Sequence, residues 1–290
     1  MTESSKTAPA GGPLVRDISD TALWVAIYRA RESERPDALF RDPFARRLAG
    51  ERGEKIAATI RTKASPDWPY VARTVRFDQI VSEQIKQGTG MVINLAAGLD
   101  TRPYRMDVPA SLQWVEVDLP AITDYMEAVL RDEKPRCSLE RVRMDLADVP
   151  ARRKLFAELG SRAKKVLVIT EGLLVYLSRD EVTALGTDLA AQSSFRDWAI
   201  DLASPGLLKM LQKELPVLSE AGSPLKFGPE EGPEFFTSCG WKPVEVYSML
   251  KTAAKVGRLS FGMRLLSLLP ESSGRQGSRP WGGVCRLTRM

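Results

Sequence analysis

Short apolar runs and amphipathic stretches alternate through the middle of this chain. The runs at 91–95 (MVINL) and 165–170 (KVLVIT) are apolar enough to be buried on both faces of a sheet. Between such runs, apolar residues recur every three or four positions, as they do on one face of a helix. This alternation is typical of a mostly parallel α/β sheet. The predicted strands are 91–95, 112–117, 141–144, 165–170 and 198–202, and the predicted helices between them are 120–131, 150–159 and 178–192.

The segments on either side of this alternation have a different pattern. Helical periodicity over 21–30, 44–58 and 70–86 predicts an N-terminal helical cap before the first strand. Residues 205–232 contain a predicted helix at 207–218 and a stretch rich in proline and glycine at 222–232. They are interpreted as a lid-like insertion after the fifth strand. The predicted organisation is a disordered tail (1–17), a helical cap (18–88), a core (89–204), the insertion (205–232) and the C-terminal part of the sheet (233–290).

Local signals define further elements. Ser178, followed three residues later by Glu181, forms a capping-box pattern at the start of a helix. Gly160 is expected to end the preceding helix, because glycine adopts the left-handed conformation of a helix C-cap without strain. The later predicted elements are a short helix (233–239), a strand (242–247), a helix (252–269), a flexible loop (271–280) and a closing strand (284–288).

The composition is that of a soluble globular protein, with 43% apolar and 27% charged residues. No run of about 18 uncharged apolar residues is present to span a bilayer, and the N-terminal tail resembles a disordered segment rather than a secretion signal. The most apolar late segment, 256–270, carries Arg258 and Arg264 and is interpreted as a packed helix. Three widely spaced cysteines, in no metal-binding pattern, fit a reducing compartment. We therefore expect a cytoplasmic protein with reduced thiols and no membrane partner.

Charge and the absence of histidine disfavour several functions. The formal charge is +5, and 42 basic residues are mixed along the chain with 37 acidic residues, so no nucleic-acid partner is predicted. Histidine usually activates the nucleophile of serine and cysteine hydrolases and commonly binds metals, and this chain has none. We therefore expect no metal site. Transfer to a carboxylate, or to a hydroxyl deprotonated by Asp, Glu or Lys, remains compatible with this composition.

Small and acidic residues follow the predicted strands. The first strand leads into a small-residue turn at 96–98 that lets a ligand approach the backbone, and the second strand ends at Asp118, about 20 residues later. This is the arrangement of a nucleoside-binding half-sheet, although the turn is no G-x-G-x-x-G match and an ordinary turn is an alternative. Acidic residues follow four successive strands: Asp100, Asp118, Asp145 and Glu171. Ligands of open α/β sheets bind at the carboxyl ends of the strands, so we predict a site there, with helix capping as an alternative for one or two of the acids.

Three sequence blocks resemble motifs of the leucine carboxyl methyltransferase family, including its bacterial branch of small-molecule O-methyltransferases. They are 94–102 (NLAAGLDTR), 116–120 (EVDLP) and 171–177 (EGLLVYL). The resemblance covers roughly residues 19–204. It implies a seven-stranded, Rossmann-like class I methyltransferase sheet with S-adenosyl-L-methionine as cofactor. Four shorter blocks similar to the bacterial branch lie at 21–22, 29–30, 42–43 and 72–74.

The resemblance also implies roles in cofactor binding. Arg73 matches the family arginine that holds the methionyl carboxylate, a partner that suits a guanidinium group. Asp118 would accept both ribose hydroxyls, and the backbone at 96–98 would pack against the amino-acid and ribose parts. Asp145 and Leu146 would contact adenine. Glu171 would lie beneath the amino group or the sulfonium. The full predicted cofactor-binding set is Arg73, Ala96, Ala97, Gly98, Asp100, Asp118, Leu119, Asp145, Leu146 and Glu171.

Several of these residues have alternative interpretations. Arg73 could form a surface salt bridge, and Asp145 could cap a helix. Tyr176, which follows the fourth strand, is the candidate for lining the acceptor site, with plain packing as its alternative. Arg102 and Arg105 could attract an acidic acceptor or could be solvated helix residues.

Methyl transfer from a positively charged sulfur mainly requires positioning of the partners and exclusion of water. A carboxylate acceptor needs no general base, which agrees with a chain that lacks histidine. We therefore predict an S-adenosyl-L-methionine-dependent O-methyltransferase that acts on a small molecule, with a carboxylate slightly preferred over a hydroxyl. Methylation of a protein C-terminus is the alternative, but Trp24 and Val25 stand where the eukaryotic protein-methylating members have a lysine. More distant alternatives are a nicotinamide-dependent dehydrogenase and a protein that binds the cofactor without catalysis.

Overall fold

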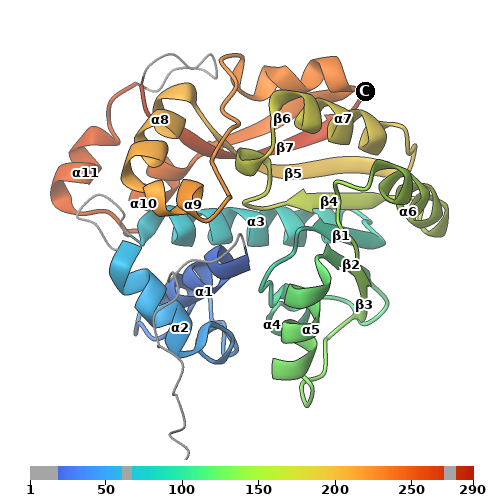
Figure 1. Ribbon diagram of the computed structural model, residues 1–290, viewed down its shortest axis with the longest axis horizontal. Helices are drawn as coiled ribbons and strands as arrows, with labels where there is room; N and C mark the ends of the chain where they lie inside the picture. Colours follow the sequence, from blue (N-terminus) through green and yellow to red (C-terminus); the bar gives the residue numbers. More distant parts are fainter. Residues whose placement is uncertain (1–18, 61–66, 271–278) are drawn as a thin grey trace, which may run out of the picture.

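A computed structural model describes residues 19–60, 67–270 and 279–290. Its centre is a seven-stranded sheet with the order β3-β2-β1-β4-β5-β7-β6 (Figure 1). The strands β1 to β5 pair in parallel, whereas β7 runs antiparallel to both of its neighbours. The strands are β1 (Met91–Leu95), β2 (Gln113–Asp118), β3 (Ser138–Arg143), β4 (Val166–Thr170), β5 (Phe195–Ala203), β6 (Trp241–Ser248) and β7 (Gly282–Arg289). The predicted seven-stranded α/β fold is confirmed, although β3 begins at 138 rather than 141 and β5 at 195 rather than 198.

Helices lie on both faces of the sheet and beside one end of it (Figure 1). Among the described residues, three helices precede β1, and the others connect or follow the strands. The helices are α1 (Ser19–Ser33), α2 (Ala45–Ile60), α3 (Trp68–Lys86), α4 (Arg102–Arg105), α5 (Pro120–Val129), α6 (Val149–Arg162), η1 (Leu174–Tyr176), α7 (Arg179–Ala190), α8 (Pro205–Glu214), α9 (Pro216–Glu220), η2 (Gly232–Cys239), α10 (Met249–Lys255) and α11 (Phe261–Leu266), where η marks a 3-10 helix.

Helix α3 covers one face of the sheet. Side chains of a strand point alternately to its two faces, and Val92 of β1 and Leu167 of β4 point to the α3 side. There they share a buried cluster with Phe77 and Ile80 of α3. The apolar residues of α3 therefore fix this helix across the central strands.

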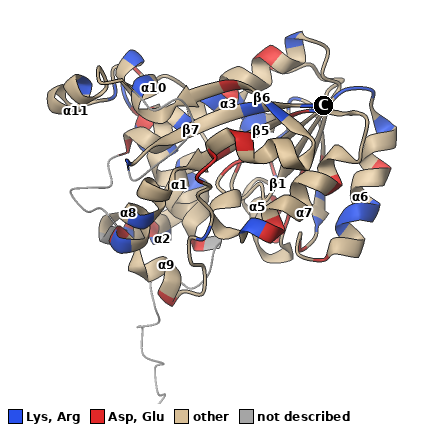
Figure 2. Ribbon diagram, turned by 90° about the horizontal axis from the view of Figure 1, so that it is seen from above, with Lys and Arg blue, Asp and Glu red and all other residues tan. Residues whose placement is uncertain are grey.

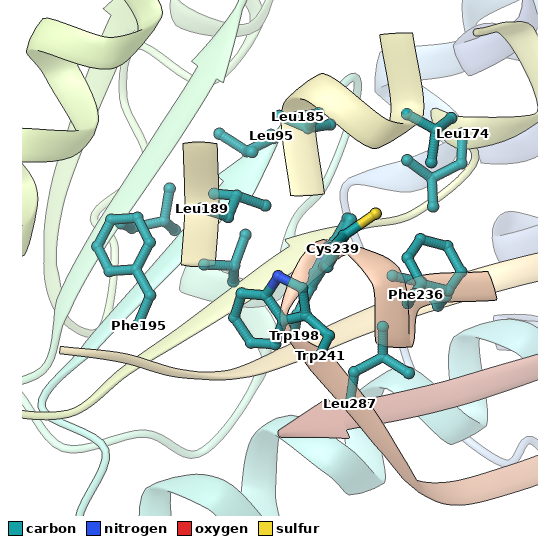
Figure 3. Packing of buried hydrophobic residues seen from close by; sticks show 14 of the residues in the cluster. Leu95, Leu174, Leu185, Leu189, Phe195, Trp198, Phe236, Cys239, Trp241 and Leu287 are labelled. Atoms are coloured by element: carbon teal, nitrogen blue, oxygen red, sulfur yellow. The ribbon is translucent and has the colours of Figure 1, made fainter. Parts of the chain in front are cut away.

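Helices α6, α7 and η2 cover the opposite face. Trp198 of β5 and Trp241 of β6 are fully buried there, and their rings meet edge to face with centroids 5.5 Å apart. Figure 3 shows both rings beside Phe236 and Cys239 of η2. Trp198 donates a hydrogen bond from Nε1 to Oγ1 of Thr170 at 3.0 Å, so its polar atom is satisfied inside the core. This layer holds the antiparallel end of the sheet against its parallel centre.

A third apolar cluster joins the helices of the predicted cap to those of the predicted insertion. It contains Leu23 and Ile27 of α1, Leu48 of α2, Met126 of α5 and Leu218 of α9. Segments far apart in the chain thus share one core beside the carboxyl ends of the strands.

Two predicted helices differ from the structure. The segment predicted as one helix at 252–269 forms α10 and α11, which are separated around Gly257, a residue with a φ of +72°. A left-handed residue ends a helix even where the apolar periodicity continues. Gly160 does not end α6, which continues to Arg162. A β-carbon at Gly160 would lie 2.9 Å from Oε1 of Gln192, so this glycine permits close packing rather than a cap.

Helices α7 and α8 are each predicted from local sequence signals. The capping box of α7 is confirmed, because Ser178 N donates to Glu181 Oε2 at 2.6 Å and Glu181 N donates to Ser178 Oγ at 3.3 Å. The helix predicted at 207–218 is instead two helices, α8 and α9, because the chain leaves helical geometry at Leu215, immediately before Pro216.

Some predictions fall outside the described residues, namely the tail at 1–17 and most of the loop at 271–280. Cys137, Cys239 and Cys285 are buried as free thiols. Over the described ranges, no helix has the length and apolar character needed to cross a bilayer.

Candidate functional site

A cavity of about 2000 Å³ lies at the carboxyl ends of the parallel strands. The turns after β1, β2 and β4 contribute to its wall, together with residues of α1, α3 and α8. All of the predicted site residues line this one cavity: Arg73, Ala96, Ala97, Gly98, Asp100, Asp118, Leu119, Asp145, Leu146, Glu171 and Tyr176. The structure therefore brings together residues that are separated by up to about 100 positions in the chain.

The turn after β1 is fixed by Asp118 at the end of β2. Gly98 N donates to Asp118 Oδ2 at 2.6 Å, and Leu119 N donates to Asp118 Oδ1 at 2.7 Å. Ala96 and Gly98 both have positive φ values, of 53° and 56°, which turn the backbone sharply at the cavity wall. Burial raises the pKa of Asp118, and the two backbone hydrogen bonds oppose that rise. The carboxylate is therefore held in one position, with acceptor capacity left for a ligand.

Asn94 supplies an unpaired acceptor beside this turn. Its Nδ2 donates to Asp100 Oδ2 at 2.7 Å. Its Oδ1 is buried and has no hydrogen-bond partner among the described residues. A buried acceptor without a donor is unfavourable, and Asn94 lines the cavity, so a ligand donor is expected here. Both carboxylate oxygens of Asp100 are used within the protein, because Oδ1 accepts a hydrogen bond from Arg102 N at 2.9 Å.

Arg73 of α3 lies between two strand-end carboxylates. Its Nε is 3.0 Å from Glu171 Oε1, and its Nη1 donates to Asp201 Oδ2 at 3.0 Å. Burial acts to lower the pKa of Arg73, but Asp201 and Glu171 more than offset it and raise the pKa above its usual value. The arginine is largely buried, so the surface-salt-bridge interpretation is wrong.

Asp201 was not identified from the sequence. It follows the same rule as the predicted acids, because it stands near the carboxyl end of β5, next to β4 in the sheet. Asp201 Oδ1 also accepts a hydrogen bond from Gly172 N at 2.7 Å, which ties β5 to the turn after β4. Extending the search for strand-end acids to the fifth strand would have found it.

Arg102 and Arg105 of α4 belong to a buried ion-pair network. Arg102 lies 2.7 Å from Asp78, 3.1 Å from Asp100 and 2.8 Å from Glu171, and Arg105 lies 2.7 Å from Asp78. Their side chains are only 4% and 5% exposed, so their interpretation as solvated helix residues is wrong. Attraction of an acidic acceptor is not favoured either, because carboxylates of the protein already compensate both charges.

Asp145 does not cap the following helix. Its Oδ1 accepts a hydrogen bond from Ala147 N at 2.9 Å within a turn. The cap of α6 is Asp148, which accepts from Ala151 N at 3.0 Å. Asp145 is exposed at the cavity wall and Leu146 is partly buried beside it. The helix-capping interpretation of Asp145 is therefore wrong.

Aromatic side chains form the wall around Tyr176. The ring of Tyr28 stacks on that of Tyr70 with centroids 4.7 Å apart, and Trp24 meets Tyr70 edge to face at 5.4 Å. These three residues and Tyr176 all line the cavity. Burial raises the pKa of Tyr176, against an opposing hydrogen bond with Thr21. Tyr176 is therefore a neutral phenol at physiological pH.

Aliphatic side chains form another part of the cavity wall. They come from α8, from α9 and the residue before it, and from α11 and the residues just after it. The main contributors are Leu207, Met210, Leu211, Leu215, Leu218, Met263, Leu266 and Leu269. The predicted insertion at 205–232 thus supplies part of the wall. In the described part of the chain, no cluster of three or more acidic or cysteine residues is arranged to hold a metal ion.

A family profile and several sequence relatives match this chain. The sequence profile described as leucine carboxyl methyltransferase matches residues 22–190. A protein of Streptomyces avermitilis, provisionally named an S-adenosyl-L-methionine-dependent methyltransferase, is 31% identical over 268 residues, which cover 88% of this chain and 92% of that protein. A Streptomyces coelicolor protein with the same kind of provisional name is 32% identical over 250 residues, which cover 82% of this chain and 87% of that protein.

Solved structures with little sequence identity share the fold. A DUF574 family protein from Streptomyces avermitilis has a TM-score of 0.57 at 14% identity, covering 90% of this chain and 96% of that chain. A protein of Thermobifida fusca, provisionally titled a methyltransferase, has a TM-score of 0.56 at 15% identity, covering 99% of this chain and 100% of that chain. On the profile match and the sequence relatives together, the chain belongs to the leucine carboxyl methyltransferase family.

Proposed function

We propose that this protein is an S-adenosyl-L-methionine-dependent O-methyltransferase that acts on a small molecule, with a carboxylate favoured over a hydroxyl as acceptor. The observation that carries the proposal is the shared cavity, which gathers the strand-end residues of a nucleoside site and an aromatic wall. Membership of the leucine carboxyl methyltransferase family and the names of the sequence relatives support S-adenosyl-L-methionine as the methyl donor.

The residues present fit this cofactor. The unpaired Oδ1 of Asn94 offers an acceptor for the amino group, and the fixed carboxylate of Asp118 offers acceptors for the ribose hydroxyls. The ion pairs of Arg73 use Nε and Nη1, which leaves Nη2 for the methionyl carboxylate. Asp145 and Leu146 lie on the cavity wall as the adenine contacts of this proposal.

When bound, S-adenosyl-L-methionine supplies a methyl carbon that is activated by a positively charged sulfur. Transfer to a carboxylate forms a carbon–oxygen bond and breaks the carbon–sulfur bond, whose electron pair stays on sulfur. An anion and a cation become a neutral ester and a neutral thioether, and no proton is released. Apolar surroundings favour such a charge-neutralising step, and in this proposal the aromatic side chains around Tyr176 supply them.

Glu171 and Tyr176, two titratable groups that line the cavity, are poorly suited to deprotonate a hydroxyl. Burial acts to raise the pKa of Glu171, but Arg102 and Arg73 hold it below its usual value, so Glu171 is a weak base. Tyr176 is neutral and can donate a hydrogen bond rather than accept a proton. A carboxylate acceptor needs neither residue as a base.

We expect calorimetry to show binding of S-adenosyl-L-methionine and S-adenosylhomocysteine to the purified protein. In a screen of carboxylic acids and phenols with methyl-labelled cofactor, the label is expected in small-molecule methyl esters, which release volatile methanol in base.

With a carboxylate acceptor, turnover should stay flat between about pH 6 and pH 9, since no base titrates. Absence of cofactor binding would overturn the proposal. Base-stable label would point to an ether, and label in lysate proteins would favour methylation of protein C-termini.

Gly172 offers a matched test of the Arg73 site. Gly172 and Gly88 both have positive φ values, of 72° and 89°, so alanine at either position is expected to cost roughly 1–2 kcal/mol of stability. A β-carbon at Gly172 would lie 3.3 Å from Arg73 Nη1, whereas at Gly88 nothing lies within 4 Å. Calorimetry should therefore show weaker cofactor binding for Gly172→Ala and unchanged binding for Gly88→Ala. Equal affinities in both variants would argue against a role for Arg73 in cofactor binding.

A further inference from the structure

We propose that the acceptor is a carboxylic acid with a long aliphatic chain, and that this chain lies along the apolar wall between Tyr176 and α11. The inference rests on the proposed function and specifies its substrate class. Three features support it: the size of the cavity, the pairing of its arginines with carboxylates of the protein, and the position of α11.

The cavity is larger than the cofactor site requires. Ligand pockets usually enclose about 300–1,000 Å³, and this one encloses about 2000 Å³. The wall around the strand ends carries the polar residues of the cofactor site. Residues from α8, α9 and α11 also line the cavity, and their contributions are mostly leucine and methionine. A second ligand of substantial size and low polarity fits this division.

The arginines near the strand ends offer little to a multiply charged ligand. Each arginine near the strand ends has a carboxylate partner among the described residues: Arg29 with Asp42, Arg73 with Asp201, Arg102 with Asp100 and Arg105 with Asp78. A multiply charged acceptor would have to displace these buried pairs, which is costly. Binding energy for the acceptor is therefore expected from apolar contacts, with a single carboxylate placed at the methyl donor.

Helix α11 marks where the apolar wall reaches the surface. It lies at one end of the molecule, beside α10 (Figure 1), and carries little charge (Figure 2). Large apolar side chains are exposed on α11 and just after it: Phe261, Leu265, Leu266, Leu268 and Leu269. Soluble proteins rarely expose such a group without a ligand or partner. Leu266 and Leu269 also line the cavity, so the apolar surface is continuous with the interior.

Adjacent leucines on α11 provide a matched pair of variants. Leu266 is 52% exposed and lines the cavity, whereas Leu265 is 54% exposed and does not. Both positions are on the surface, so a polar substitution at either is expected to change stability by at most about 0.5 kcal/mol. Any difference between Leu266→Gln and Leu265→Gln therefore reports on the cavity rather than on folding.

The test uses straight-chain acids from hexanoate to tetradecanoate, kept below their micelle concentrations. Calorimetry on the protein loaded with S-adenosylhomocysteine measures acid binding, and gas chromatography measures methyl ester formation. Affinity is expected to rise by about threefold to fourfold for each added methylene, the ratio that corresponds to burying one such group. Leu266→Gln should weaken tetradecanoate binding by about threefold to tenfold and hexanoate binding by less, while Leu265→Gln matches the wild type.

The outcomes separate this inference from the proposed function. An affinity that does not depend on chain length, or equal effects of Leu265→Gln and Leu266→Gln, would overturn the inference even if short acids are methylated. Chain-length-dependent binding that Leu266→Gln weakens, without ester formation, would support the apolar site while counting against carboxylate methylation. Binding of the longer acids only by self-association of the protein, seen by light scattering, would also overturn the inference.

Discussion

Replacing Asp118 with alanine is expected to weaken binding of S-adenosyl-L-methionine by at least about 100-fold. The backbone N–H groups of Gly98 and Leu119 hold the Asp118 carboxylate in place before any ligand arrives. A hydrogen bond to a charged acceptor contributes about 1.5–3 kcal/mol. Loss of two such bonds to the ribose hydroxyls therefore corresponds to about two or more orders of magnitude in affinity. Isothermal titration calorimetry measures the change.

The controls for this prediction separate ligand contacts from folding. Asp118→Asn keeps an acceptor but loses the charge, so an intermediate affinity is expected. Asp124→Ala removes a carboxylate of α5 that is exposed and paired with Arg143, and should bind the cofactor as the wild type does. The thermal unfolding of each variant shows whether the fold is retained. Unchanged cofactor affinity in a folded Asp118→Ala protein would contradict the proposed ribose contact and weaken the proposed function.

Replacing Arg102 with methionine is expected to lower the free energy of unfolding by about 3–5 kcal/mol. Arg102 is buried and lies within ion-pair distance of Asp78, Asp100 and Glu171. Methionine retains the apolar volume but leaves carboxylates buried without their counter-charge. Urea denaturation measures the change, which corresponds to a fall of roughly 10 °C in the unfolding midpoint.

Arg143→Met is the matched control for the buried network. Arg143 also contacts two carboxylates, those of Asp124 and Glu127, but its side chain is 40% exposed. Solvent screens such pairs, so the expected loss is at most about 1 kcal/mol. Similar losses in the two variants would show that burial of the Arg102 network adds nothing to stability.

The strand-end acids show why much of this site could be predicted from sequence. Parallel strands place their carboxyl ends at one edge, so residues such as Asp118 and Glu171 must meet once the strands are identified. The apolar runs identified the strands because burial on both faces leaves few polar residues in them. These two rules need no knowledge of long-range packing. They gather the predicted residues around one cavity, while the roles of those residues in binding remain proposals.

Arg102 and Arg105 show where such reasoning stops. An arginine in a short helix is usually solvated, and only the three-dimensional placement of Asp78 from α3 reveals that these two are buried. The division of the predicted 252–269 helix is a similar case. Its apolar periodicity continues through Gly257, and the left-handed backbone there depends on local geometry that periodicity does not encode. Side-chain pairing across distant segments and backbone breaks are both set by tertiary structure.

The position of β7 has a consequence for the order in which the chain can fold during synthesis. β7 follows β6 in the chain but lies between β5 and β6 in the sheet. While the ribosome makes β6, the strand that will pair with it does not yet exist, and β5 also presents an open edge. Open edges can recruit other chains, and the edges of β5 and β6 that β7 covers stay open until β7 is made. Gly282, the first residue of β7, lines the cavity as well, so the nascent chain closes its sheet and completes its ligand site in the same late step.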